Sequence, residues 1–73
     1  MTQEKQNEII SLIFEDYNIE FKDVKKMTYE DSVYSYDIKD EINQEMSLEV
    51  NFKEAYYRVT TKEFEEIIEL VTL

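Results

Sequence analysis

Apolar and polar residues alternate without a break from Met46 to Phe52, which predicts a β-strand. The apolar residues lie on one side of this strand: Met46, Leu48, Val50 and Phe52. The residues between them are polar and lie on the other side. The pattern therefore predicts a sheet with one buried face, which another part of the chain must cover.

A helical pattern precedes this strand, from about Glu4 to Tyr17. Its apolar residues recur at helical spacing and are Ile9, Ile10, Ile13, Phe14 and Tyr17, with Leu12 widening the stripe. Thr2 is a suitable N-cap, and Asn18 can take the left-handed conformation that closes a helix. The same spacing turns Glu4, Glu8 and Glu15 toward solvent.

Three more strands are predicted, at Val24–Tyr29, Val33–Asp40 and Ala55–Val59. The first has irregular alternation, so we expect a bulge or a late start there. The turn before the second strand contains Asp31, and the chain has no glycine. A tight primed turn is therefore not expected. We expect instead a longer turn, or one built on Asp31.

The end of the chain has the features of a second helix. Thr60 and Glu63 form a Thr-x-x-Glu capping box. The inner stripe of this helix would be Phe64, Ile67, Ile68 and Val71, and its outer face would be Glu65, Glu66 and Glu69. The predicted fold is α+β, in the order α-β-β-β-β-α: an antiparallel meander of three or four strands, with an N-terminal and a C-terminal helix packed on one face. It forms a single domain over residues 1–73.

Charge is the strongest compositional feature. Eighteen acidic and eight basic residues give a formal net charge of -10, while a hydrophobic content of 42% is too high for a disordered chain. A core of this size stabilises a monomer only modestly, so we expect a homodimer. The sequence shows no secretory leader and no apolar run long enough to cross a bilayer, so we expect a cytoplasmic protein.

Histidine and cysteine are both absent, which removes the commonest general base, the commonest metal ligand and any disulfide. The acidic stretch from Asp37 to Glu45 has Lys39 at a position where a calcium loop needs an oxygen ligand, and it lacks the central glycine. Paired carboxylates need a cleft and a raised pKa to act as acid and base. We therefore expect neither an enzyme nor a cofactor or metal site.

A fixed array of carboxylates can imitate the phosphates of DNA. Side chains one helical turn apart are separated by about 6 Å, and alternate residues of a strand by roughly 6.5 to 7 Å. Successive phosphates of one DNA strand lie at a comparable distance, given a rise of about 3.4 Å per base pair and the helical winding. Glu4 and Glu8 have this spacing. The candidate partner-binding residues are Glu30, Asp31, Asp37, Asp40, Glu41, Glu45, Glu49, Glu65, Glu66 and Glu69.

In its size, acidity and lack of cysteine and histidine, the chain resembles the small acidic phage-encoded proteins that act as DNA mimics. The resemblance implies an inhibitor that occupies the basic surface of a host DNA-binding protein in a bacterial cell. Such targets include histone-like proteins of the HU type, restriction enzymes, uracil-DNA glycosylase and CRISPR effectors, and we favour the first. Lys22, Lys25 and Lys26 form a basic group, so the mimicry would be confined to other faces.

An adaptor is the alternative. In that case the acidity only keeps the protein in solution, and an apolar or tyrosine patch binds a protein partner. The sheet segments contain several tyrosines, of which Tyr56 is the best candidate for an exposed anchor. Most of these tyrosines are also expected to serve as core or cross-strand contacts. Direct binding to nucleic acid or membranes is disfavoured because the net charge repels both.

Overall fold

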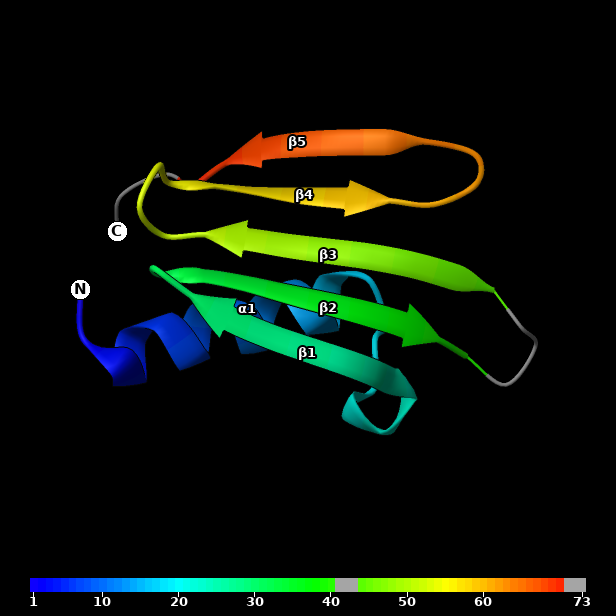
Figure 1. The fold of residues 1–73 in the computed structure, drawn as a ribbon, viewed down its shortest axis with the longest axis horizontal. Coiled ribbons are helices and arrows are strands. Elements are labelled where there is room, and N and C mark those ends of the chain that lie inside the picture. The colour runs from blue at the N-terminus through cyan, green and yellow to red at the C-terminus, as the bar shows by residue number, and fades with distance from the viewer. Residues whose placement is uncertain (41–43, 71–73) are drawn as a thin grey trace.

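A single helix and a five-stranded meander make up the fold in the computed structural model, which describes residues 1–40 and 44–70 (Figure 1). The elements are α1 (Gln3–Asp16), the 3-10 turn η1 (Phe21–Asp23), β1 (Val24–Glu30), β2 (Val33–Lys39), β3 (Glu45–Asn51), β4 (Tyr56–Thr60) and β5 (Glu65–Glu69). The strands lie side by side in the order β1-β2-β3-β4-β5, and each neighbouring pair is antiparallel. The α+β class is as predicted, but the described residues do not form the predicted second helix.

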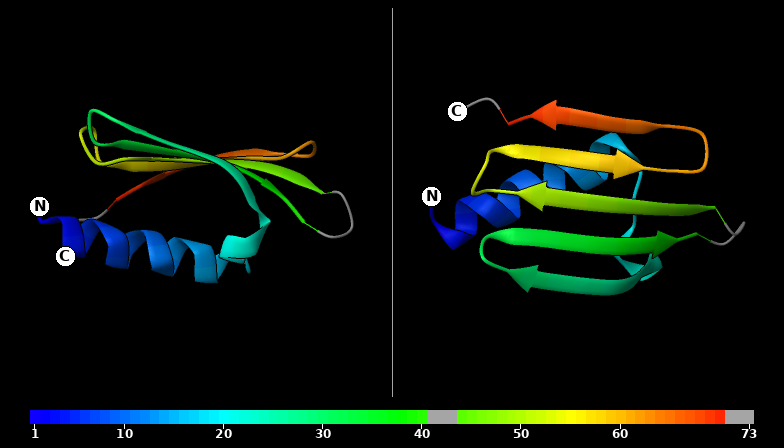
Figure 2. Two further views of the ribbon diagram at one scale, coloured as in Figure 1. Left: turned by 60° about the horizontal axis from the view of Figure 1, so that its bottom comes forward. Right: turned by 45° about the horizontal axis from the view of Figure 1, so that its top comes forward.

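The helix forms one layer and the sheet the other, with α1 crossing one face of the sheet (Figure 2). The core between them consists of Ile10, Ile13 and Phe14 from the helix and of Tyr34, Tyr36, Ile38, Leu48, Val50, Tyr57 and Val59 from β2, β3 and β4. We call the sheet face toward α1 the inner face and the opposite one the outer face. Val50 and Val59 have no exposed surface, so the middle of the inner face is its best-packed part.

Both ends of α1 are capped as predicted. The Thr2 hydroxyl accepts a hydrogen bond from the Lys5 backbone N–H at 3.1 Å. Asn18 adopts a φ of 56°, and the Ile19 N–H donates to the Phe14 carbonyl at 2.8 Å. The prediction for Leu12 was wrong: its side chain is 53% exposed.

The predicted alternation of β2, β3 and β4 is confirmed. Tyr34, Tyr36 and Ile38 of β2 are buried on the inner face, as are Leu48 and Val50 of β3. In β4 the inward residues are Tyr57 and Val59, again as predicted. The expected irregularity in β1 is a bulge between Val24 and Lys26, after which pairing to β2 is regular.

The turn between β1 and β2 is built on Asp31, as predicted, but it is of the tight primed kind that was not expected. Asp31 and Ser32 have φ values of 51° and 66°, and Glu30 pairs directly with Val33. This is a tight two-residue turn of the primed kind, formed without glycine. Asp tolerates the left-handed region better than most residues, and the Ser32 carbonyl accepts a hydrogen bond from the Phe52 N–H at 2.9 Å, which holds the turn in place.

The predicted C-terminal helix was wrong, because the chain forms β5 there and pairs with β4. The Thr61 hydroxyl accepts hydrogen bonds from the N–H groups of Glu63 and Phe64, and so closes a turn instead of capping a helix. Ile68 faces the core while Ile67 is 57% exposed on the outer face. A short isolated helix is marginal in water, whereas a strand here satisfies the free backbone edge of β4. Val71 lies outside the described residues.

Candidate acidic binding surface

The side of α1 that faces away from the sheet carries three carboxylates, Glu4, Glu8 and Glu15, which we call the α1 stripe. All three are exposed, and none forms an ion pair with another described residue. Glu4 and Glu8 are one turn apart, or about 6 Å, and Glu15 lies roughly 10 Å further along the axis. Lys5 is the one basic residue in the helix, so the stripe is a concentrated negative surface.

Burial of the opposite side of α1 fixes the direction of the stripe. Gln6 is buried beside the apolar residues of the helix, and its side-chain carbonyl accepts a hydrogen bond from the Tyr34 hydroxyl at 3.2 Å. This contact anchors the first half of the helix to β2. Glu15 was predicted to face solvent but was not among the predicted site residues. Its position seven residues after Glu8, two helical turns, was the signal that joins it to the stripe.

The carboxylates predicted on a C-terminal helix are separated by the strand. Glu65 and Glu69 lie on the outer face, four residues apart along a strand and thus roughly 13 Å from one another. Glu66 lies on the inner face, where it accepts a hydrogen bond from the Tyr17 hydroxyl at 2.7 Å. The phosphate-like spacing expected for this group is therefore absent. Burial raises the pKa of the Tyr17 hydroxyl well above its ordinary value, and the bond to Glu66 raises it further.

The other carboxylates of the outer face alternate with basic residues. Asp37 pairs in register with Lys26, and Lys39 lies 3.9 Å from Glu45. Glu49, at the centre of this face, lies 3.4 Å from the Arg58 guanidinium and accepts a hydrogen bond from the Tyr56 hydroxyl at 3.1 Å. These contacts make the outer face a surface of mixed charge.

Tyr56, the predicted anchor, does lie on the outer face, but it is half-buried there. The Arg58 guanidinium carbon lies 5.8 Å from the centre of its ring, and its hydroxyl donates to Glu49. The Arg58 Nε is buried without a hydrogen-bond partner among the described residues. The pairing of Glu49 with Arg58, which follows from the β3–β4 register, was not predicted.

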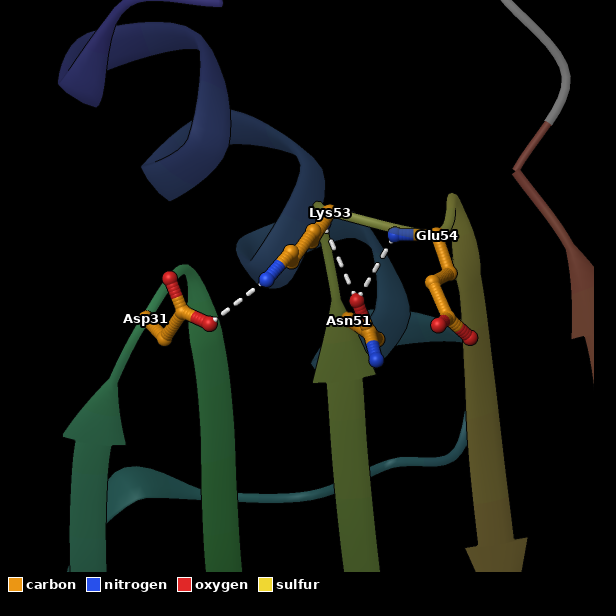
Figure 3. Close-up of polar contacts among 4 residues, drawn as sticks. All are labelled: Asp31, Asn51, Lys53 and Glu54. Carbon is orange, nitrogen blue, oxygen red and sulfur yellow. Dashed lines mark hydrogen bonds and ion pairs between the residues drawn. The ribbon is translucent and has the colours of Figure 1, made fainter.

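The acidic turns are also tied into the structure. Asp31 forms an ion pair with Lys53 at 2.9 Å, and this hydrogen bond raises the Lys53 pKa (Figure 3). Beside it, the Asn51 side-chain oxygen accepts hydrogen bonds from the N–H groups of Lys53 and Glu54, at 3.0 and 2.8 Å. The Asp40 carboxylate accepts one from the Gln44 N–H at 2.9 Å. Glu30 is exposed at the end of β1, and Glu41 lies outside the described residues.

Basic residues gather at the end of the sheet that lies beside the C-terminal end of α1. Lys25, Lys39 and Lys62 line a hollow of about 440 Å³, together with the carboxylates of Asp37 and Glu45. Lys25 and Lys39 lie on β1 and β2, and Lys62 lies in the turn that leads to β5. The hollow extends the basic group that the sequence indicated, and Lys62 also lines a second hollow with Tyr17 at the end of α1.

Comparison with protein-family models, with curated protein sequences and with solved structures finds no significant match to this chain. No helix within residues 1–40 and 44–70 is long and apolar enough to span a membrane. Across the same residues, no three acidic side chains come together as metal ligands would. Fold and site together define a one-helix, five-stranded α+β domain with an acidic helix surface.

Proposed function

We propose that the protein inhibits a basic nucleic-acid-binding protein of a bacterial host by occupying its DNA-binding surface with the α1 stripe. The observation that carries this proposal is the run of three exposed carboxylates along the helix, in a chain of net charge -10. The outer face contributes less, because its carboxylates alternate with basic residues. The proposal places the protein in the cytoplasm and gives it no enzymatic role.

The physical basis is the one that drives DNA binding itself. A polyanion releases bound counterions when it meets a groove of Lys and Arg, and a rigid helix loses little conformational entropy when it binds. The spacing of Glu4 and Glu8, about 6 Å, is close to that of neighbouring phosphates. Binding should therefore weaken steeply as salt is added. A histone-like protein of the HU type is the favoured target class, by the resemblance to acidic phage proteins.

A DNA-displacement assay tests the proposal. A labelled duplex is bound to a purified HU-type protein in about 50 mM salt, and the acidic protein is added. We expect displacement by the unmodified protein. The triple variant Glu4→Gln, Glu8→Gln and Glu15→Gln should be about ten- to a hundredfold weaker, because each lost exposed contact contributes up to about 1 kcal/mol.

A matched variant distinguishes the effect of the α1 stripe on binding from the effect of net charge. Glu20, Glu54 and Glu63 are exposed, lie outside α1 and are not candidate binding residues, so changing all three to Gln alters the net charge equally. This control should displace DNA almost as well as the unmodified protein. Equal weakening by both triple variants would contradict a role specific to the stripe. Capture of a host partner that persists in about 1 M salt would favour the adaptor alternative instead.

A further inference from the structure

The outer edge of β1 is the least covered part of the sheet. Every residue from Lys25 to Glu30 is exposed, and the side chains of Met27 and Tyr29, on the inner face, are 52% and 53% exposed. Phe21, just before the strand, is 69% exposed. Figure 1 shows β1 at the border of the sheet, with β2 on its other side. Large apolar side chains beside an unpaired strand edge are typical of an interaction surface.

The backbone of β1 determines which groups are available for pairing. In a hairpin closed by a two-residue turn, the residues flanking the turn form a hydrogen-bonded pair, and bonded and non-bonded pairs then alternate. Glu30 flanks the turn, so Glu30 and Thr28 direct their backbone groups to β2. Met27 and Tyr29 therefore direct their N–H and C=O groups to the open edge.

We infer that β1 pairs antiparallel with β1 of a second copy of this chain, in the register that places Thr28 opposite Thr28. In this register Met27 meets Tyr29 of the second copy on the inner face, and Lys26 meets Glu30 on the outer face. Each contact occurs twice because the interface is two-fold symmetric. The residues that must exchange backbone hydrogen bonds, Met27 and Tyr29, are the ones whose groups face the edge. The two five-stranded sheets become one continuous sheet, with both helices on the same side.

Other registers and the other edge fit less well. A shift of one strand by two residues keeps the backbone pattern but separates Lys26 from Glu30. Pairing of β5 with β5 around Ile67 would place Glu65 opposite Glu69, and like charges directly opposite each other are destabilising. Pairing of β1 with β5 would be head-to-tail and would leave a free edge at each end, so it would build chains instead of dimers. The inference does not rest on the proposed function.

Charge exchange across the interface tests this pairing. Sedimentation velocity of the full chain, from about 1 µM to about 1 mM, should show a monomer–dimer equilibrium, because so small an interface binds weakly. Lys26→Glu and Glu30→Lys each turn two attractive pairs into two repulsive ones. Each single variant should weaken dimerisation at least about tenfold. The double variant restores opposite charges and should regain most of the affinity.

Three controls test whether the result is specific to the interface. Lys26→Glu also places a carboxylate opposite Asp37 within the chain, but the double variant retains that change, so its recovery reports the contact between copies. Met27→Pro removes an N–H that faces the open edge and is not needed by β2, and it should give a folded monomer by circular dichroism. Glu63→Lys, an exposed change in the turn before β5, should leave the dimer unchanged.

Three results would overturn the inference. They are a wild-type protein that stays monomeric throughout the concentration range, a double variant that dimerises no better than the single ones, and assembly of the wild-type protein beyond the dimer. The last result would indicate head-to-tail pairing of β1 with β5.

Discussion

Leu48 and Leu12 provide a matched test of the packing, since the same substitution is made at a buried and at an exposed leucine. Leu48 on β3 is 1% exposed, and Leu12 on α1 is 53% exposed. Replacing Leu48 with Ala removes three carbons from the core, at about 0.8 kcal/mol each, and leaves a cavity. We expect a loss of roughly 3 kcal/mol, which is a large share of the stability of so small a domain.

Leu12→Ala should cost less than about 1 kcal/mol, because half of the side chain is already in water and Ala favours the helix. In a domain of this size each kcal/mol shifts the Tm by about 4 to 8 °C. Thermal and urea unfolding followed by circular dichroism should therefore separate the two variants by at least about 8 °C. Equal losses would refute the assignment, because they would mean that the Leu12 side of α1 is also buried.

Two further predictions concern the turn and the alkaline limit of stability. Ser32→Gly should raise the free energy of unfolding by about 0.5 to 1 kcal/mol, because glycine adopts a positive φ without strain and Asp-Gly is a favoured pair in primed turns. A lower free energy of unfolding for this variant, measured by urea unfolding, would contradict this. Because the pKa of Tyr17 is raised, the folded state keeps the proton of the Tyr17 hydroxyl to higher pH than the unfolded chain does. The stability that this protonated hydroxyl contributes is therefore fully present below pH 10.0 and is lost as the pH rises above that value. Tyr17→Phe, which also removes the bond to Glu66, should reduce the fall in stability above pH 10.0; equal pH profiles for the wild type and Tyr17→Phe would refute this.

The sequence predicted those elements whose pattern fits one structure only. Strict alternation in β3 has no helical interpretation, and the caps at Thr2 and Asn18 are local chemistry, so both were predicted correctly. Between a helix and a strand, the pattern of Glu65-Glu66-Ile67-Ile68-Glu69 favours the helix, because its two apolar residues are adjacent and do not alternate with polar ones. The decision between them depends on the free edge of β4, which is a tertiary effect that a local pattern does not contain.

The same reason divides the site predictions. The spacing of Glu4 and Glu8 was predicted correctly because the helix that contains them, α1, was itself predicted correctly. Glu66 was expected beside Glu65 on a water-facing surface, but the strand turns it to the inner face and to Tyr17. The contact between Glu49 and Arg58 depends on strand register, which pairs residues nine positions apart. Partners of this kind cannot be found until the order and register of the strands are known.

The meander has a consequence for how rapidly the chain reaches its native state. Each strand pairs with the strand next to it in sequence, so four short hairpins can close early at small entropic cost. Docking of the helix is different, because the bond from Tyr17 to Glu66 joins residues 49 positions apart. The late step of folding should therefore be the docking of α1 onto a sheet that has already formed. Substitutions at Tyr17 should then accelerate unfolding more than they slow refolding.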